Sequence, residues 1–101
     1  MTNLHTAFAQ KSTSLFALGR LLISQGSRRL FNGKIYELIE LIGRHHSGDW
    51  GLISDEDWQS NDLAMRRGWR ILSVYRAAGE LVWIITEGDR SATTVLLPDE
   101  Y

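Results

Sequence analysis

The chain changes its pattern at Gly68, and this change constrains the fold more than any other feature. Before Gly68 apolar residues recur at helical intervals, whereas after it they follow the alternation of extended chain. Residues 69–76, 81–86 and 92–97 each read as a β-strand, and residues 77–80 read as a hairpin turn. Pro98 ends the last strand because proline has no N–H to donate. The sequence therefore predicts a C-terminal meander.

Two segments before Gly68 predict clear helices. The first, residues 34–45, places apolar side chains on one helical face, namely Ile35, Leu38, Ile39 and Ile42. We expect Asn32 to cap its start by accepting a backbone N–H. The second helix, residues 54–67, begins at Ser54 as the N-cap and ends at Gly68 in a left-handed conformation.

The remaining N-terminal part is less regular. Residues 24–32 are expected to form a short helix, and residues 1–14 a loose arm. The apolar run at residues 15–23 is compatible with strand or helix, and we interpret it as a strand because Gly19 weakens a helix. The sequence thus predicts one α+β domain over residues 15–101. In it, two or three helices pack on an antiparallel sheet of three to four strands that ends in the meander.

Composition narrows the classes of function. The chain has no cysteine, which excludes disulfides, thiolate catalysis and sulfur-ligated zinc. Its net charge of −1 gives no bulk attraction for nucleic acid or an anionic membrane. No apolar stretch is long enough to span a bilayer, and the N-terminus does not read as a signal peptide. We therefore expect a cytoplasmic protein without membrane partners, metal or cofactor.

Several blocks of the sequence form a recognisable pattern, namely Leu18–Leu21, Arg44–Gly51, Asn61–Tyr75, Trp83–Glu87, Asp89–Ser91, Thr93–Thr94, Leu96–Pro98 and Glu100–Tyr101. Together they resemble small proteins encoded on bacterial plasmids and integrative elements. The resemblance covers roughly the last four fifths of the chain and implies an origin on a mobile element. Small acidic or neutral proteins in that setting often inhibit host defence by binding a defence protein, while others regulate transfer or act as toxins. The group has no agreed function. Some members are labelled as a type I restriction-modification subunit, which does not suit a chain without a glycine-rich cofactor loop.

One cluster of residues could support catalysis. The turn from Thr86 to Ser91 crowds charged and hydroxyl groups between two apolar strands. A metal-free ribonuclease needs a histidine or carboxylate to take the 2′-hydroxyl proton, and arginines to hold the phosphate. The residues for this chemistry would be His45, His46, Arg70, Glu87 and Arg90. The simpler interpretation, which we favour, is a solvated turn with Arg90 paired to Glu87, and histidines that end a helix.

A second set of residues could bind a partner protein. It comprises Asp49, Trp50, Arg66, Arg67, Asp89 and Arg90. Trp50 lies in a glycine-framed loop, where an aromatic side chain is either an exposed anchor or a plug over the core, the plug being the favoured alternative.

The sequence favours protein binding over catalysis. The expected function is that of a non-enzymatic mobile-element protein, an inhibitor of host defence of the anti-CRISPR or antirestriction type. The alternative is a small ribonuclease or toxin with a barnase- or RelE-like sheet. A DNA-binding regulator ranks last, because Asp55, Glu56 and Asp57 would meet phosphates at the start of their helix. A homodimer is also compatible with the sequence.

Overall fold

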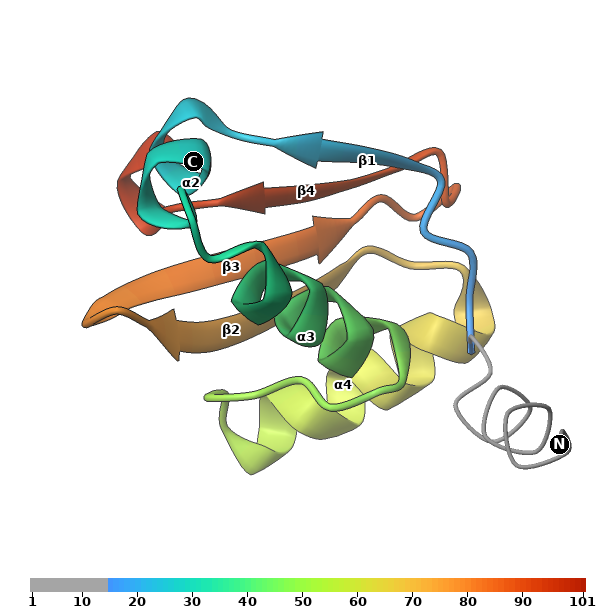
Figure 1. Ribbon diagram of the computed structural model, residues 1–101. Helices are drawn as coiled ribbons and strands as arrows, with labels where there is room; N and C mark the ends of the chain where they lie inside the picture. The colour runs from blue at the N-terminus through green and yellow to red at the C-terminus, as the bar shows by residue number, and fades with distance from the viewer. Residues whose placement is uncertain (1–14) are drawn as a thin grey trace, which may run out of the picture.

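The boundary at Gly68 separates helices from the meander in the computed structural model, which describes residues 15–101. In chain order the elements are β1 (Arg20–Ile23), α2 (Gln25–Leu30), α3 (Ile35–His46), α4 (Asp55–Arg67), β2 (Ile71–Ala77), β3 (Glu80–Thr86), β4 (Ala92–Leu96) and the 3-10 helix η1 (Pro98–Glu100) (Figure 1). The α+β class is confirmed. The predicted arm at residues 1–14 lies outside the described residues.

The four strands form one sheet in the order β1-β4-β3-β2. The meander pairs antiparallel as predicted, but β1 runs parallel to β4, so the sheet is mixed. The strand predicted at residues 15–23 exists only over Arg20–Ile23. No hairpin links β1 to β4, because the chain leaves β1 through the helices and re-enters the sheet at the far edge (Figure 1). The direction of β1 therefore depends on tertiary packing.

The alternation predicted for the meander assigns each strand residue to a face of the sheet. Ile71, Ser73 and Tyr75 are buried on the inner face, while Leu72 and Val74 are partly exposed on the outer face. Ala78 and Gly79 both have positive φ, as a tight two-residue hairpin requires. Trp83, which its apolar strand predicts to be core, is half-buried on the outer face and packs edge-on against Tyr101.

Local signals set the ends of α4 correctly but misplace the start of α3. The Ser54 hydroxyl accepts the N–H of Asp57, and Gly68 ends α4 with φ 75°. The N-cap of α3 is Lys34, which makes no side-chain cap bond, so the predicted cap at Asn32 is wrong. None of the helices in the described part of the chain is long and apolar enough to cross a membrane.

The buried face of α3 differs from the face that its apolar pattern predicts. Leu38, Leu41 and His45 are buried, whereas Ile35 and Ile39 are 53% and 55% exposed. Successive residues of a helix are separated by about 100°, so this face is turned by less than one residue from the predicted one. The rotation takes a histidine into the core and leaves two isoleucines at the surface.

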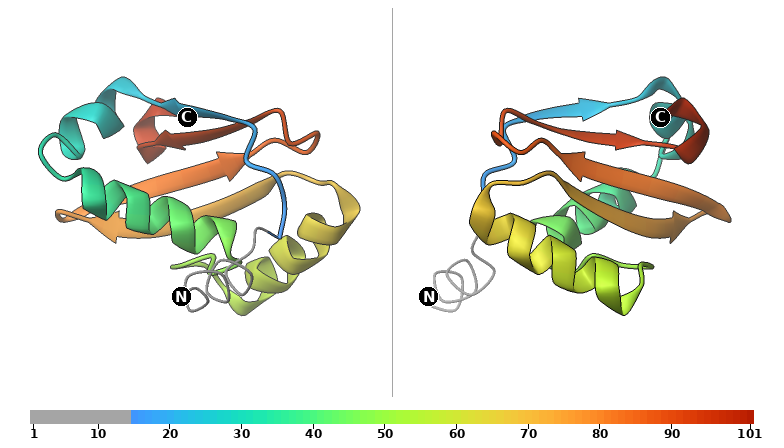
Figure 2. Two further views of the ribbon diagram at one scale, coloured as in Figure 1. Left: turned by 45° about the vertical axis from the view of Figure 1, so that its right-hand side comes forward. Right: turned by 180° about the vertical axis from the view of Figure 1, so that it is seen from behind.

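The core consists of two hydrophobic clusters on the inner side of the sheet. One cluster lies under α3 and is formed by Phe31, Leu38, Leu41, Tyr75, Val82, Ile84 and Val95. The other lies at α4 and is formed by Phe16, Trp50, Ala64 and Ile71. Seen from several sides, α3 lies across the sheet while α4 runs beside β2 (Figure 2).

The two edge strands of the sheet, β2 and β1, differ in whether their outward backbone groups have partners among the described residues. At β2 the Asn61 amide donates to the carbonyl of Leu72 at 2.7 Å, and Leu52 and Trp50 exchange backbone hydrogen bonds with Val74. This edge is therefore covered. At the other edge, no described residue pairs with the outer side of β1.

Candidate functional site

His45 is fully buried at the end of α3, where it contacts the inner face of the sheet. Its Nδ1 lies 2.6 Å from the Ser73 hydroxyl, and its Nε2 lies 2.8 Å from the Thr86 hydroxyl. The Thr86 hydroxyl is 2.7 Å from that of Thr93, which donates to the carbonyl of Leu18 at 2.7 Å. A continuous chain of hydrogen bonds therefore crosses the core.

The direction of every bond in this chain follows from its last member. Each hydroxyl has a single proton, and Thr93 gives its proton to a carbonyl that can only accept. Thr86 must then donate to Thr93, so it accepts from the N–H at Nε2 of His45. A neutral imidazole accepts at its other nitrogen, where Ser73 donates. The arrangement satisfies all four side chains with a neutral, Nε2-protonated histidine.

The surroundings of His45 favour the same neutral state. Burial lowers the pKa of His45 to about 3, with smaller contributions from the charges of His46 and Arg90. The rings of Phe16 and Trp50 pack edge-on against it at 5.4 Å and 5.8 Å between centroids. Both ring nitrogens are already hydrogen-bonded within the core, so neither can take a proton from a substrate in solvent.

The side chain of His46 is not part of the His45 network. Its Nε2 donates to the backbone carbonyl of Phe16 at 2.9 Å, which ties the end of α3 to the segment before β1. Adjacent helical residues project about 100° apart, which explains why the two histidines have separate partners.

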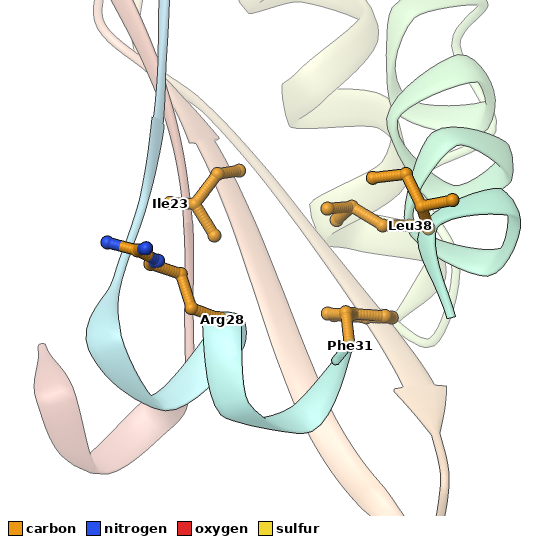
Figure 3. Close-up of a pocket in the computed structure, with 5 residues that line it drawn as sticks. Ile23, Arg28, Phe31 and Leu38 are labelled. Carbon is orange, nitrogen blue, oxygen red and sulfur yellow. The ribbon is translucent and has the colours of Figure 1, made fainter. Parts of the chain in front are cut away.

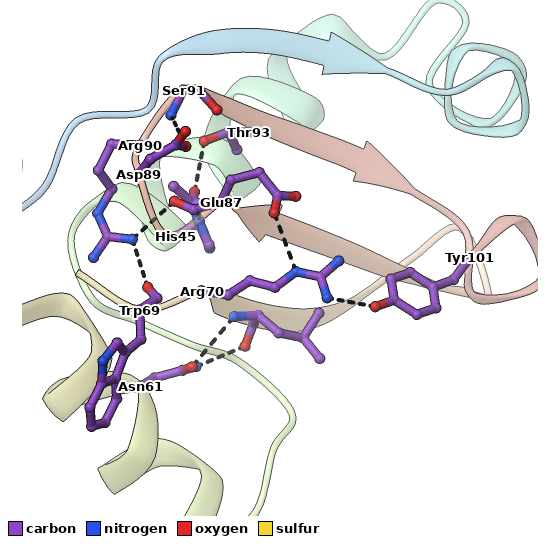
Figure 4. A network of polar contacts seen from close by, with 12 residues as sticks. His45, Asn61, Trp69, Arg70, Glu87, Asp89, Arg90, Ser91, Thr93 and Tyr101 are labelled. Atoms are coloured by element: carbon purple, nitrogen blue, oxygen red, sulfur yellow. Dashed lines mark hydrogen bonds and ion pairs between the residues drawn. The ribbon is translucent and has the colours of Figure 1, made fainter. Parts of the chain in front are cut away.

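Arg90 lies in the charged turn, and its guanidinium is hydrogen-bonded to the backbone of Trp69 and Glu87 (Figure 4). Its guanidinium donates to the carbonyls of Ala64 at 3.0 Å, Met65 at 3.4 Å and Trp69 at 2.7 Å, and to that of Glu87 at 3.1 Å. The last carbonyls of a helix have no partner within it, and a cation there also suits the helix dipole. Arg90 therefore caps a helix from a turn that is distant in sequence.

The carboxylate of Glu87 faces Arg70, with 3.7 Å between Oε1 and Nε, on the outer side of the sheet. Arg70 also donates to the Tyr101 hydroxyl at 2.6 Å. The predicted pairing of Glu87 with Arg90 is therefore wrong, since Arg90 contacts only the backbone carbonyl of Glu87.

The five residues of the ribonuclease hypothesis have three separate environments. His45 is sealed in the core, and His46 and Arg90 bind backbone carbonyls. Arg70 and Glu87 pair with each other at the surface. The structure therefore brings neither histidine to the surface pair of Glu87 and Arg70, and the ribonuclease hypothesis loses its histidine base at that place.

Trp50 closes over the hydrophobic core and is not an exposed anchor for a partner protein. Its side chain is fully buried, and its Nε1 donates to Asp62 at 2.9 Å. Asp49 pairs with Arg44 at 2.7 Å, and this guanidinium holds the pKa of Asp49 below its usual value. The arrangement fastens the loop after α3.

The other predicted binding residues lie around the charged turn and the end of α4. The exposed Asp89 accepts the N–H of Ser91 at 2.9 Å, as an aspartate in a turn commonly does. Arg66 and Arg67 are exposed, and Arg67 lies over the half-exposed ring of Trp69 with 5.8 Å to the centroid. These charges are available at the surface.

A further surface feature was not predicted. A groove of about 460 Å³ opens between β1 and α3 and is lined by Ile23, Arg28, Phe31, Ile35 and Leu38. Its apolar side chains converge on the hollow, with Arg28 beside them (Figure 3). Next to it, Tyr36 and Ile39 are 84% and 55% exposed. The signal in the sequence was the apolar excess of α3, which carries more isoleucine and leucine than its buried face accommodates.

Comparisons of the chain with known protein families, with curated proteins and with solved structures find no match. Among the described residues, no group of three or more histidine or acidic side chains is arranged to hold a metal ion. The two features that stand out for function are therefore the buried histidine network and the apolar groove.

Proposed function

We propose that the chain acts by binding another protein through the exposed apolar face of α3 and the groove beside it. This surface, termed the α3 surface, consists of Tyr36, Ile39 and the residues of the groove. The observation that carries the proposal is the exposure of Ile35, Tyr36 and Ile39 side by side on one helix. Exposed apolar patches that adjoin a groove are typical of protein interaction sites.

The side chains of the α3 surface indicate which kinds of side chain a partner would present. An aliphatic or aromatic side chain fits the groove between Phe31 and Leu38, and Tyr36 supplies an aromatic contact beside it. Arg28 at the rim offers a bidentate partner for a carboxylate. The proposed partner therefore presents an apolar side chain next to an acidic one.

The proposed biological role is inhibition of a bacterial defence protein in the cytoplasm. This role rests on the resemblance to proteins of plasmids and integrative elements, together with the absence of cysteine. The contacts of His45 also support binding over catalysis, because its nitrogens have internal partners.

The proposal is tested by replacing both surface isoleucines. The variant Ile35→Gln, Ile39→Gln keeps helix-forming side chains but removes the apolar contact. Affinity capture of the tagged chain from a bacterial host lysate should recover a specific partner with the wild type. The double variant should bind that partner at least about tenfold more weakly, equivalent to a loss of about 1.4 kcal/mol.

The matched control is Leu52→Gln, which changes an equally exposed aliphatic residue away from the groove. It should bind like the wild type, and circular dichroism should show the same fold for all three proteins. Equal binding by the wild type and the double variant would contradict the proposal.

A further inference from the structure

On the outer edge of β1, the backbone groups pair with no other residue within the described range 15–101. Arg20 and Ser24 donate their N–H groups to Ser91 and Val95, toward β4. Alternate residues of a strand direct their N–H and C=O groups to opposite sides, so Leu21 and Ile23 direct theirs away from the sheet. Leu21 and Leu22 are also 46% and 39% exposed. An open edge with apolar side chains is a template for another strand.

We propose that a second copy of the chain pairs with this edge, antiparallel and about a two-fold axis at Leu22. The two sheets would then join into one continuous sheet with the two β1 strands at its centre. Such a contact is self-complementary, because each residue meets the same residues of the other copy. This self-association is independent of the partner proposed for the α3 surface.

The hydrogen-bonding pattern selects this register. With Leu22 opposite Leu22 of the second copy, Leu21 lies opposite Ile23 of the second copy. Both residues direct their N–H and C=O groups outward, so the two copies exchange four backbone hydrogen bonds. Centring the pair on Leu21 would require Gly19 to be extended, but its φ is +67°. Centring it on Ile23 would require Gln25, the first residue of α2.

Charge complementarity supports the same register. Arg20 comes opposite Ser24 of the second copy, and the hydroxyl of Ser24 donates to Glu100 at 2.6 Å. An arginine side chain at this position can reach the Glu100 carboxylate of the other copy. The two-fold axis generates the contact between Arg20 and Glu100 twice, so two arginine–carboxylate contacts flank the four hydrogen bonds.

The far edge of the sheet explains why the assembly would stop at two copies. There Asn61, Trp50 and Leu52 pair with the outward backbone groups of Leu72 and Val74 in the middle of β2. With only one open edge per chain among the described residues, the contact closes on itself and does not propagate into a fibre.

The register gives a sharp test because the chain has no cysteine. Opposite residues of a non-hydrogen-bonded pair have Cα atoms about 4.5 Å apart, within the range that a disulfide spans. Leu22→Cys should therefore form a disulfide-linked dimer on mild oxidation. Arg20→Cys on the same strand should not, because its copies would lie about 14 Å apart along the strand direction at about 3.4 Å per residue.

Sedimentation of the full chain supplies the second readout. The wild type should dimerise, and Leu22→Lys should raise the dissociation constant at least about tenfold because two lysines would oppose each other at the axis. The matched control Leu52→Lys should dimerise like the wild type. A wild type that stays monomeric at high micromolar concentration would overturn the proposal, as would equal cross-linking of the two cysteine variants.

Discussion

His45 shows how one side chain can order a core. Ser73, Thr86 and Thr93 occupy inward positions on three neighbouring strands, where hydroxyls would be costly without partners. The imidazole supplies one donor and one acceptor to this set, and the carbonyl of Leu18 fixes the direction of all the bonds. His45, one of the residues that the ribonuclease hypothesis considered for proton transfer, thus has a structural role.

The stability of the protein should fall in mild acid because of His45. Its pKa is lowered to about 3 from an ordinary value of 6.5, so between these values the unfolded chain binds the extra proton. The contribution of His45 to the free energy of unfolding is fully present above pH 6.5 and is lost as the pH falls toward 3. One such proton gives about 1.4 kcal/mol per pH unit in the free energy of unfolding. Urea denaturation from neutral pH to about pH 4.5 measures this slope.

The control for this prediction is His45→Gln, which cannot gain the proton. It should be less stable than the wild type at neutral pH but should show a shallower dependence on pH. The carboxylates and His46 are common to both proteins, so the difference in slope isolates His45. Nitrogen-15 shifts should also report a protonated Nε2 and an unprotonated Nδ1. Parallel slopes would contradict the assignment.

At the scale of elements, the start of α4 depends on local residues alone, whereas its end depends on the local Gly68 and also on the distant Arg90. Ser54 caps its start and Gly68 turns the chain at its end, as the sequence predicts. The carbonyls of Ala64 and Met65 receive the guanidinium of Arg90, which lies in the turn before β4. These hydrogen bonds hold α4 against the meander. They join residues that are distant in the chain, so no local sequence pattern predicts them.

Replacing Arg90 should therefore destabilise the fold. Arg90→Met keeps the length of the side chain and the positive φ of 63° while removing the donors. The expected loss in the free energy of unfolding is about 1 to 3 kcal/mol, because a partly buried, charge-assisted group is removed from several carbonyls. Thermal or urea denaturation measures it. Arg66→Met, at an exposed position of α4, should stay within about 0.5 kcal/mol of the wild type, and equal losses would contradict the prediction.

At the scale of the whole molecule, the histidine network connects parts that are far apart in the chain. It runs from Leu18 before β1 through β4 and β3 to α3 and β2, between the two hydrophobic clusters. Polar groups that satisfy one another in this way allow one arrangement of the elements and penalise others.

Removing one hydroxyl tests this role of the network. Thr93→Val is nearly the same shape but leaves the carbonyl of Leu18 without its donor and the Thr86 hydroxyl without its acceptor. A loss of about 1 to 3 kcal/mol in the free energy of unfolding is expected. The matched variant Thr94→Val changes the neighbouring residue on the outer face and should have little effect. The role of the network would be refuted if the two variants were equally stable.

Much of the fold could be predicted because its signals are local. The hairpin at Ala78-Gly79, the alternation in β2 and the caps of α4 each depend on residues within a few positions of one another. The candidate site was less predictable. The residues proposed around the charged turn are real surface or capping groups, but Arg90 points to α4 and Glu87 to Arg70.

The sequence by itself determined that α3, α4 and the three strands of the meander form, because their hydrogen bonds and side-chain periods repeat over a few residues. Only the tertiary structure decided which face of α3 is buried, that His45 is internal, and that β1 runs parallel to β4. Each of these depends on groups that are distant in the chain, whose desolvation and hydrogen bonding are settled together when the layers pack. The same packing left Ile35 and Ile39 exposed beside the groove, where we propose that a partner binds.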